Sequence, residues 1–145
     1  MILYMDLCCF NRPFDDQLQQ KIYLETEAKL FIQKKIKDGE YKLIWSYILE
    51  YENSVNPDEE TRNSIQKWEG VAIRTIVENQ TVTSMASDLN KSGFGIKDAL
   101  HIACAINAQA RYFITVDRGI LKKREIIKDL SIINPLEFIS LENEP

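Results

Sequence analysis

Short apolar runs alternate with longer helical patterns along this chain. The runs suited to buried strands are Ile2 to Met5, Leu43 to Trp45, Tyr112 to Val116 and Ser131 to Ile133. Helical patterns lie between them, most clearly over residues 17–37, which Gly39 would end, and over 97–109. Strands separated by helices pair in parallel through right-handed crossovers. The sequence therefore predicts an α/β fold, a three-layer α/β/α sandwich with a central parallel sheet.

The segments between these elements are less regular. Residues 11–16 predict a turn or loop, and residues 47–54 predict a helix. Asn56 and Pro57 have the residue types of a helix cap and a first helical position, with acidic residues following. Residues 71–77 fit either a helix or a short extended piece, whereas 81–90 and a basic segment through about residue 129 read as helices.

Size and composition favour one cytoplasmic domain. A chain of 145 residues with 45% hydrophobic content suits a single core, so we expect one domain over 1–145. The apolar runs are too short to cross a membrane, and the N-terminal residues lack the features of a signal peptide. The three cysteines form neither an even disulfide framework nor a C-x-x-C spacing, so we expect free thiols.

Four acidic residues stand where an α/β protein places its chemistry. Asp6, Glu52, Asp98 and Asp117 each follow an apolar run or lie at the mouth of a helix. Ligands of open parallel sheets bind outside the carboxyl ends of the strands, where such side chains meet. Converging carboxylates repel one another unless a cation lies between them, and a hard divalent cation suits them best. Each acid singly also has a simpler explanation as a helix cap, a turn residue or a surface charge.

Other ionisable residues are less informative. His101 lies between Leu100 and Ile102 in an alanine-rich helix, where a packed structural histidine is the favoured interpretation. The net charge of −4 does not exclude nucleic acid, since a bound metal reverses the sign of an acidic pocket. A basic cluster after Asp117 is either a solvated face or part of the site; it comprises Arg118, Lys122, Lys123 and Arg124.

Four segments of the chain carry a resemblance to the PIN domain family. Leu3-Tyr4-Met5-Asp6 and the Ser46-led segment that reaches Glu52 resemble the first half of a PIN domain. The segment from Ile96 to Ala105, which contains Asp98, resembles the third motif of the family, and the segment from Phe113 to Asp117 resembles the fourth. The ending from Ile132 to Phe138 is similar to that of bacterial members. The resemblance covers nearly the whole chain, with the motifs in the family's order.

The resemblance implies a PIN-like fold and a metal-dependent endoribonuclease. It implies that Asp6, Glu52, Asp98 and Asp117 form one catalytic pocket that holds Mg²⁺ or Mn²⁺. It also implies similarity to VapC-type toxins of toxin-antitoxin pairs, with RNA as substrate and an antitoxin protein as partner. The polar residue of the fourth motif carries over to Thr115, which we place with the substrate-binding residues. Whether the chain forms a homodimer stays open.

The chemistry of the residues agrees with this expectation. Phosphodiester hydrolysis needs an acidified water and neutralisation of developing charge, which metal ions supply. We expect Asp6, Asp98 and Asp117 to bind the metal, directly or through water, and Glu52 to join them or to orient the attacking water. Arg12, Lys97 and Arg118 are the candidates to hold the RNA backbone.

Two departures from the family pattern keep alternatives open. Cys8 stands where the family often has a small hydroxyl or amide side chain. Glu50 could replace Glu52 if the helix is misread by one turn, although the spacing from Ser46 favours Glu52. A degenerate PIN-like domain that binds RNA or protein without cleavage is therefore the first alternative. The second is a receiver-like signalling domain with a Mg²⁺ site, although the lysine that such a domain needs after a later strand is absent.

Overall fold

A central parallel sheet organises the computed structural model of this protein, which describes residues 1–11, 13 and 15–142. The strands are β1 (Ile2–Met5), β2 (Lys42–Ser46), β3 (Arg74–Ile76), β4 (Tyr112–Ile114) and β5 (Ser131–Ile133). The α-helices are α1 (Leu7–Asn11), α2 (Gln20–Lys37), α3 (Tyr47–Ser54), α4 (Glu59–Gln66), α5 (Gln80–Lys91), α6 (Ile96–Asn107), α7 (Arg118–Lys122) and α8 (Pro135–Glu142). Among the described residues, η2 (Lys67–Gly70) and η3 (Arg124–Ile126) are 3-10 helices.

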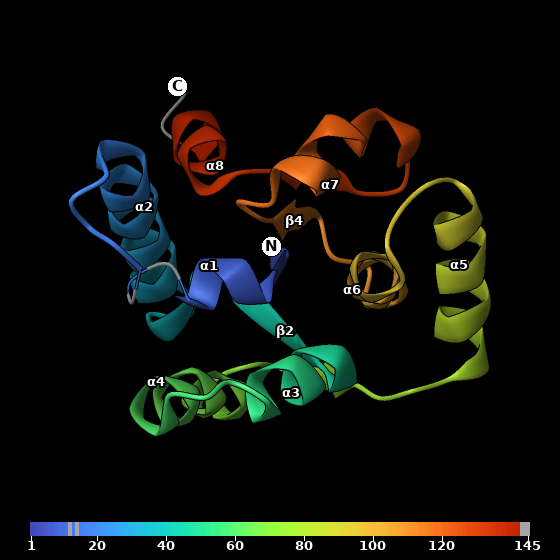
Figure 1. Ribbon diagram of the computed structural model, residues 1–145, viewed down its shortest axis with the longest axis horizontal. Coiled ribbons are helices and arrows are strands. Elements are labelled where there is room, and N and C mark those ends of the chain that lie inside the picture. Colours follow the sequence, from blue (N-terminus) through green and yellow to red (C-terminus); the bar gives the residue numbers. More distant parts are fainter. Residues whose placement is uncertain (12, 14, 143–145) are drawn as a thin grey trace.

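The described strands lie in the order β3-β2-β1-β4-β5, and every neighbouring pair is parallel. Helices α2 and α8 lie on one side of the sheet, and α5 and α6 lie on the other (Figure 1). This arrangement confirms the predicted three-layer α/β sandwich. It also differs from the 2-1-3-4-5 order of receiver domains, so the receiver-like alternative is wrong.

The central strands are buried on both faces, as continuous apolar runs in a parallel sheet predict. Leu3, Tyr4 and Met5 of β1 have no exposed surface, nor does the Leu43–Trp45 run of β2. The rings of Tyr4 and Phe113 stack across the β1–β4 pair with centroids 5.3 Å apart. This packing fixes the two strands after which Asp6 and Asp117 follow.

Helix ends agree with the sequence at some positions and correct it at others. Gly39 ends the α2 region with a φ of 83°, and its amide donates to Ile36, as a glycine stop predicts. The cap of α4 is Asp58, whose carboxylate accepts from Glu60 and Thr61, so the prediction of Asn56 as the cap was wrong. Residues 74–76 adopt the extended alternative as edge strand β3. The basic segment after Asp117 is two short pieces, α7 and η3, instead of one helix.

No helix among the described residues combines the length and the apolar character needed to cross a membrane.

Candidate active site

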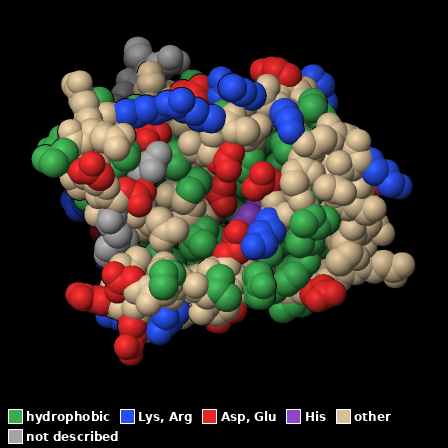
Figure 2. Space-filling view, in the orientation of Figure 1, with side chains coloured by type: hydrophobic (Ala, Val, Ile, Leu, Met, Phe, Trp, Pro, Cys, Tyr) green, Lys and Arg blue, Asp and Glu red, His purple; other side chains and the backbone are tan. Residues whose placement is uncertain are grey.

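The four predicted acids lie around the carboxyl ends of β1 and β4. Asp6 directly follows β1, and Asp117 lies three residues after the end of β4. Glu52 is carried by α3, and Asp98 lies in the first turn of α6. Acidic side chains and the single histidine gather in a hollow near the centre of one face (Figure 2). The sheet topology therefore brings four separate segments to one region.

Three side chains form the tightest part of this region. Ligand-type atoms of Asp6, Glu52 and His101 all lie within 4.8 Å of one another. The Nε2 atom of His101 is hydrogen-bonded to Glu52 Oε1 and lies 3.7 Å from Asp6 Oδ1. Asp98 and Asp117 do not belong to this compact group, which is the one such group among the described residues. The three side chains form a possible metal site.

His101 is held from behind by a buried chain of hydroxyl groups. Its Nδ1 atom lies 2.6 Å from the hydroxyl of Tyr4, which in turn lies 2.6 Å from Ser46 Oγ. The same Ser46 oxygen accepts the amide of Leu49 and so caps α3. Burial lowers the pKa of His101, but the bond to Glu52 and the charge of Asp6 more than offset it, so the net pKa is raised.

The sequence interpretation of His101 was incomplete. The residue is packed, with 1% of its surface exposed, but both ring nitrogens take part in the hydrogen-bond network of the site. A signal for this role is present in the sequence. Asp98 and His101 are three residues apart on a helix, a spacing that places two side chains on the same face.

Asp6 is fixed by hydrogen bonds to both carboxylate oxygens. Oδ1 accepts the amide of Leu7 at 2.8 Å, and Oδ2 accepts the hydroxyl of Thr115 at 2.9 Å. The amide of Asp117 donates to the same Thr115 oxygen at 3.0 Å. Thr115 is fully buried. The hydroxyl of Thr115 thus links Asp6 to Asp117, and contact of Thr115 with substrate stays a prediction.

Cys8 occupies the place of the small hydroxyl or amide side chain of the family pattern. Its Sγ atom donates to Asp6 Oδ2 at 3.5 Å and accepts the amide of Val116 at 3.4 Å. The thiol thus provides the donor that a hydroxyl would provide. A hydrogen bond with Cys9, burial and the charge of Asp6 raise the pKa of Cys8 well above its ordinary value. Such a thiol is a poor nucleophile, as the sequence predicts.

Asp98 and Asp117 face the compact group from α6 and α7. Asp117 caps α7 by accepting the amide of Ile120 at 3.1 Å. Burial first, and then the charges of Asp117 and Asp6, raise the pKa of Asp98 from 3.8 to about 6. A carboxyl responds in this way when other carboxylates lie nearby without a neutralising cation. Asp98 is also the third residue of α6, so it is not the helix cap of the simpler interpretation.

Glu50 is engaged away from the other acids. Its Oε2 atom accepts Trp45 Nε1 at 3.0 Å and Gln66 Nε2 at 2.8 Å. Glu52 is the residue of this helix that reaches His101 and Asp6. The structure therefore brings Glu52, and not Glu50, to the acidic site.

The predicted basic contacts occupy different surroundings. The Nζ atom of Lys97 lies over the ring of Tyr51, 5.7 Å from its centroid. Arg118 and Lys122 line a cavity of about 410 Å³ beside Arg124, whose guanidinium is paired with Glu137 at 2.9 Å. Arg12 lies outside the described residues. Lys97 and Arg118 are thus the predicted contacts that the structure places on surfaces next to Asp98 and Asp117.

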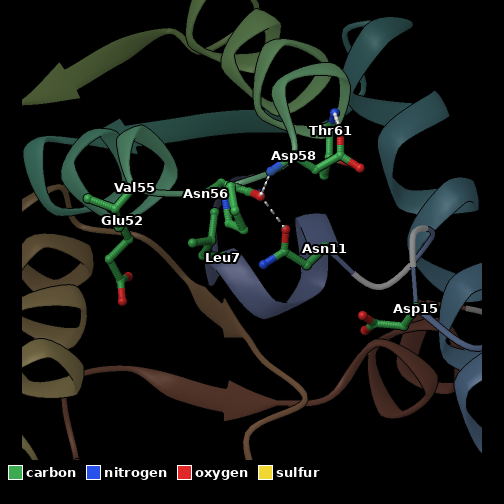
Figure 3. A pocket seen from close by; sticks show the side chains of 9 residues that line it. Leu7, Asn11, Asp15, Glu52, Val55, Asn56, Asp58 and Thr61 are labelled. Carbon is green, nitrogen blue, oxygen red and sulfur yellow. Dashed lines mark hydrogen bonds between the residues drawn. The ribbon is translucent and has the colours of Figure 1, made fainter.

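A second cavity of about 370 Å³ extends from Glu52 along α1, α3 and the start of α4. Glu52 lies at one end of it and Asp15 at the other, with Asn11 and Asn56 hydrogen-bonded between them at 3.4 Å (Figure 3). Asp58 also lines this space. Carboxylates and amides therefore line the surface that continues from the site, beside the apolar side chains of Leu7, Val55 and Pro57.

Similar proteins are found by comparison of structures and not by comparison of sequences. The sequence matches no protein-family model and no curated protein. The structure is similar to a chain of VapBC2 from Rickettsia felis, bound to a DNA fragment from its promoter, with a TM-score of 0.56 and 17% identity over 92% of this chain and 98% of that one. It is also similar to a chain of VapBC-1 from nontypeable Haemophilus influenzae, with a TM-score of 0.59 and 18% identity over 94% and 99%. The chain therefore has a PIN-like fold, shared with these VapBC structures over more than nine-tenths of its length.

Proposed function

We propose that this protein is a metal-dependent endoribonuclease that hydrolyses RNA phosphodiester bonds, and that it is the toxin of a toxin-antitoxin pair. The convergence of Asp6, Glu52, Asp98 and Asp117 at the carboxyl ends of the central strands carries this proposal. The raised pKa of Asp98 supports it, because burial and then the charges of Asp117 and Asp6 cause that shift, and perturbed carboxyls of this kind gather at functional sites. The PIN-like fold supports RNA as the substrate.

The donor atoms suit Mg²⁺ or Mn²⁺. Carboxylate oxygens are the ligands that both ions prefer, and four carboxylates leave room for bound water. Both ring nitrogens of His101 are already engaged, by Tyr4 and by Glu52. We therefore assign metal ligation to Asp6, Asp98 and Asp117, directly or through water, and assign to His101 the task of holding Glu52.

Each residue then has a role that follows from its contacts. When bound, such an ion supplies an acidified water and neutralises charge developing on the phosphate. Hydrogen bonds from Leu7, Cys8 and Thr115 fix the Asp6 carboxylate, so Asp6 is preorganised before substrate binds. Glu52, held by His101, accepts a proton from the attacking water and orients it. Lys97 and Arg118 attract the RNA backbone to an otherwise acidic pocket.

A cleavage assay tests the activity. Purified protein is incubated with a labelled RNA and Mn²⁺, in parallel with EDTA and with the Asp98→Asn variant. We expect cleavage that EDTA and Asp98→Asn both abolish. The matched control is Asp88→Asn, which removes an exposed aspartate from α5 and should cleave normally. Cleavage that persists in Asp98→Asn would contradict the assignment, and absence of cleavage with either metal would favour a degenerate, RNA- or protein-binding domain.

The partner is tested separately from the chemistry. The two similar structures described above are VapBC assemblies, which supports an antitoxin protein as the partner of this chain. We expect expression of the protein alone to arrest growth and Asp98→Asn to relieve the arrest. Co-expression with the product of the adjacent reading frame should also relieve it and yield a complex in size-exclusion chromatography. Arrest unaffected by that product would argue against an antitoxin at that locus.

A further inference from the structure

An exposed strip on α3 runs beside the acidic site. Tyr47 and Tyr51 of α3 and its C-cap residue Val55 are spaced by four residues, so they follow one face of the helix, along which Tyr47 is partly buried. Tyr51 and Val55 are 55% and 63% exposed, so both side chains are open to a ligand that binds beside the acids. Hydrophobic side chains also border the acidic cluster over α3 and α6 (Figure 2). The strip therefore lies within reach of whatever binds at the acids.

The strip connects two hollows of the surface. Val55 lines the cavity that begins at Glu52, and Tyr47 lines a separate cavity of about 370 Å³ together with Ile96 of α6. Tyr51 lies between these two residues along α3. An extended ligand that entered one hollow and left through the other would pass over the ring of Tyr51.

A cation completes the surroundings of that ring. The Nζ atom of Lys97 lies 5.7 Å from the Tyr51 centroid, so α6 contributes a positive charge over an aromatic residue of α3. Both members are sequence neighbours of proposed site residues, Tyr51 of Glu52 and Lys97 of Asp98. A flat aromatic face beside a cation, next to the proposed cleavage site, matches how proteins hold unpaired nucleotides: the base stacks and the charge contacts the backbone.

We propose that Tyr51 and Lys97 form a stacking subsite for the base of a nucleotide adjacent to the cleaved phosphate. This inference rests on the proposed ribonuclease function and adds a substrate-binding residue, Tyr51, to it. In this subsite the ring of Tyr51 stacks on the base and the ammonium of Lys97 pairs with the neighbouring phosphate. Every base has a π-face, so the subsite accepts any base and stacking strength gives only a modest preference among bases.

Steady-state cleavage of a short RNA tests the subsite. Replacing Tyr51 by Leu keeps an apolar side chain of moderate size and removes the ring. We expect KM to rise about 10-fold with kcat changed less than about twofold, in line with the loss of one stacked base. Tyr51→Phe should behave as wild type, and Lys97→Met should raise KM and weaken its dependence on salt. The matched control, Tyr23→Leu, removes a ring of similar exposure from α2 and should change neither constant.

Fluorescence gives a readout that needs no cleavage. RNAs carrying 2-aminopurine at successive positions are bound to the Asp98→Asn protein, and stacking on Tyr51 should quench the probe at one position only. Tyr51→Leu in the same background should restore the emission. If no position is quenched, or if quenching survives Tyr51→Leu, the subsite is refuted even where wild-type protein cleaves RNA. If RNA bound and quenched normally but was never cleaved, the proposed function would fail while the subsite stood.

Sedimentation velocity addresses the competing occupant of this strip, a second copy of the chain. We expect Tyr51→Leu to leave the sedimentation coefficient of the wild-type protein unchanged. A dimer that Tyr51→Leu dissociates, together with unaltered KM, would assign the strip to self-association and overturn the stacking proposal.

Discussion

Removal of the Asp98 charge is expected to stabilise the metal-free protein while it abolishes cleavage. Asp98 has a pKa of about 6 because burial and the charges of Asp117 and Asp6 disfavour its ionised form. Asparagine has nearly the same shape and carries no charge. Asp98→Asn should therefore relieve the carboxylate repulsion that is present in the folded protein while no cation is bound.

The size of the effect follows from the pKa. The pKa of Asp98 rises from 3.8 to about 6, and each pKa unit corresponds to about 1.36 kcal/mol. The folded state therefore disfavours the ionised form by about 3 kcal/mol. Asp98 is only partly buried, so solvent screening reduces this to about 1.5 kcal/mol. Losing a negative charge from the first turn of α6 costs about 0.5 kcal/mol. A net gain of about 1 kcal/mol remains, which raises Tm by about 3 to 5 °C for a chain of this size.

The pH dependence has a definite sign. The pKa of Asp98 is higher in the folded than in the unfolded state, so the folded state binds more protons between about pH 4 and pH 6. The wild-type protein consequently loses stability from this group as the pH rises through that range. The advantage of Asp98→Asn should be complete near pH 8, smaller near pH 5 and almost absent near pH 4.

Thermal and urea denaturation in EDTA measure this difference directly, with Asp88→Asn as the exposed control. Addition of Mn²⁺ should stabilise the wild-type protein more than Asp98→Asn, because ligand binding stabilises the state that binds it. The reasoning is refuted if Asp98→Asn is no more stable than wild type near pH 8, or if its advantage does not shrink on acidification.

Two further substitutions test the buried polar groups. Tyr4→Phe leaves Ser46 Oγ and His101 Nδ1 without their shared partner, so it should cost about 1 to 3 kcal/mol in urea unfolding and slow cleavage, whereas Tyr41→Phe, at an exposed hydroxyl, should cost much less. Burial lowers the pKa of Lys29, which is 3% exposed, to about 7. The unfolded state then binds more protons than the folded state between about pH 7 and 10, so the stability of the protein rises with pH in this range. Lys29→Met should therefore stabilise the protein near pH 7, and this gain should fade near pH 10.

The sequence predicted the elements whose pattern is long or strongly buried. Strand β1 and helix α6 follow from an unbroken apolar run and from an alanine-rich helical repeat. Helix α1 was not predicted, because five residues after a strand carry too little periodicity to distinguish a helix from a loop. Strand β3 stayed ambiguous for a similar reason: its three residues lie at the sheet edge, and two of them are exposed.

The site shows the same division between local and tertiary information. Asp6 and Asp117 were found because the end of a strand is a position readable from the sequence. The spacing from Ser46 favoured Glu52 over Glu50, but the reason that Glu50 stays away lies in Trp45 and Gln66, whose contacts with it only the fold reveals. The contacts of Tyr4 with His101 join residues 97 positions apart, and only the packing of α6 against the sheet reveals them. Sequence spacing identifies residues whose position alone marks them, whereas residues whose role depends on a distant partner are identified only from the structure.

The position of Ser46 explains how the fold couples the site to the core. Its hydroxyl caps α3, the helix that carries Glu52, and also contacts Tyr4, which contacts the imidazole that binds Glu52. One buried oxygen thus fixes Glu52 twice, through the start of its helix and through its hydrogen-bond partner. Repulsion from Asp6 would otherwise turn Glu52 toward solvent, where its helix leaves it partly exposed. The acidic pocket can therefore exist before a cation arrives, because packing and hydrogen bonds in the core offset the repulsion that a bound metal would remove.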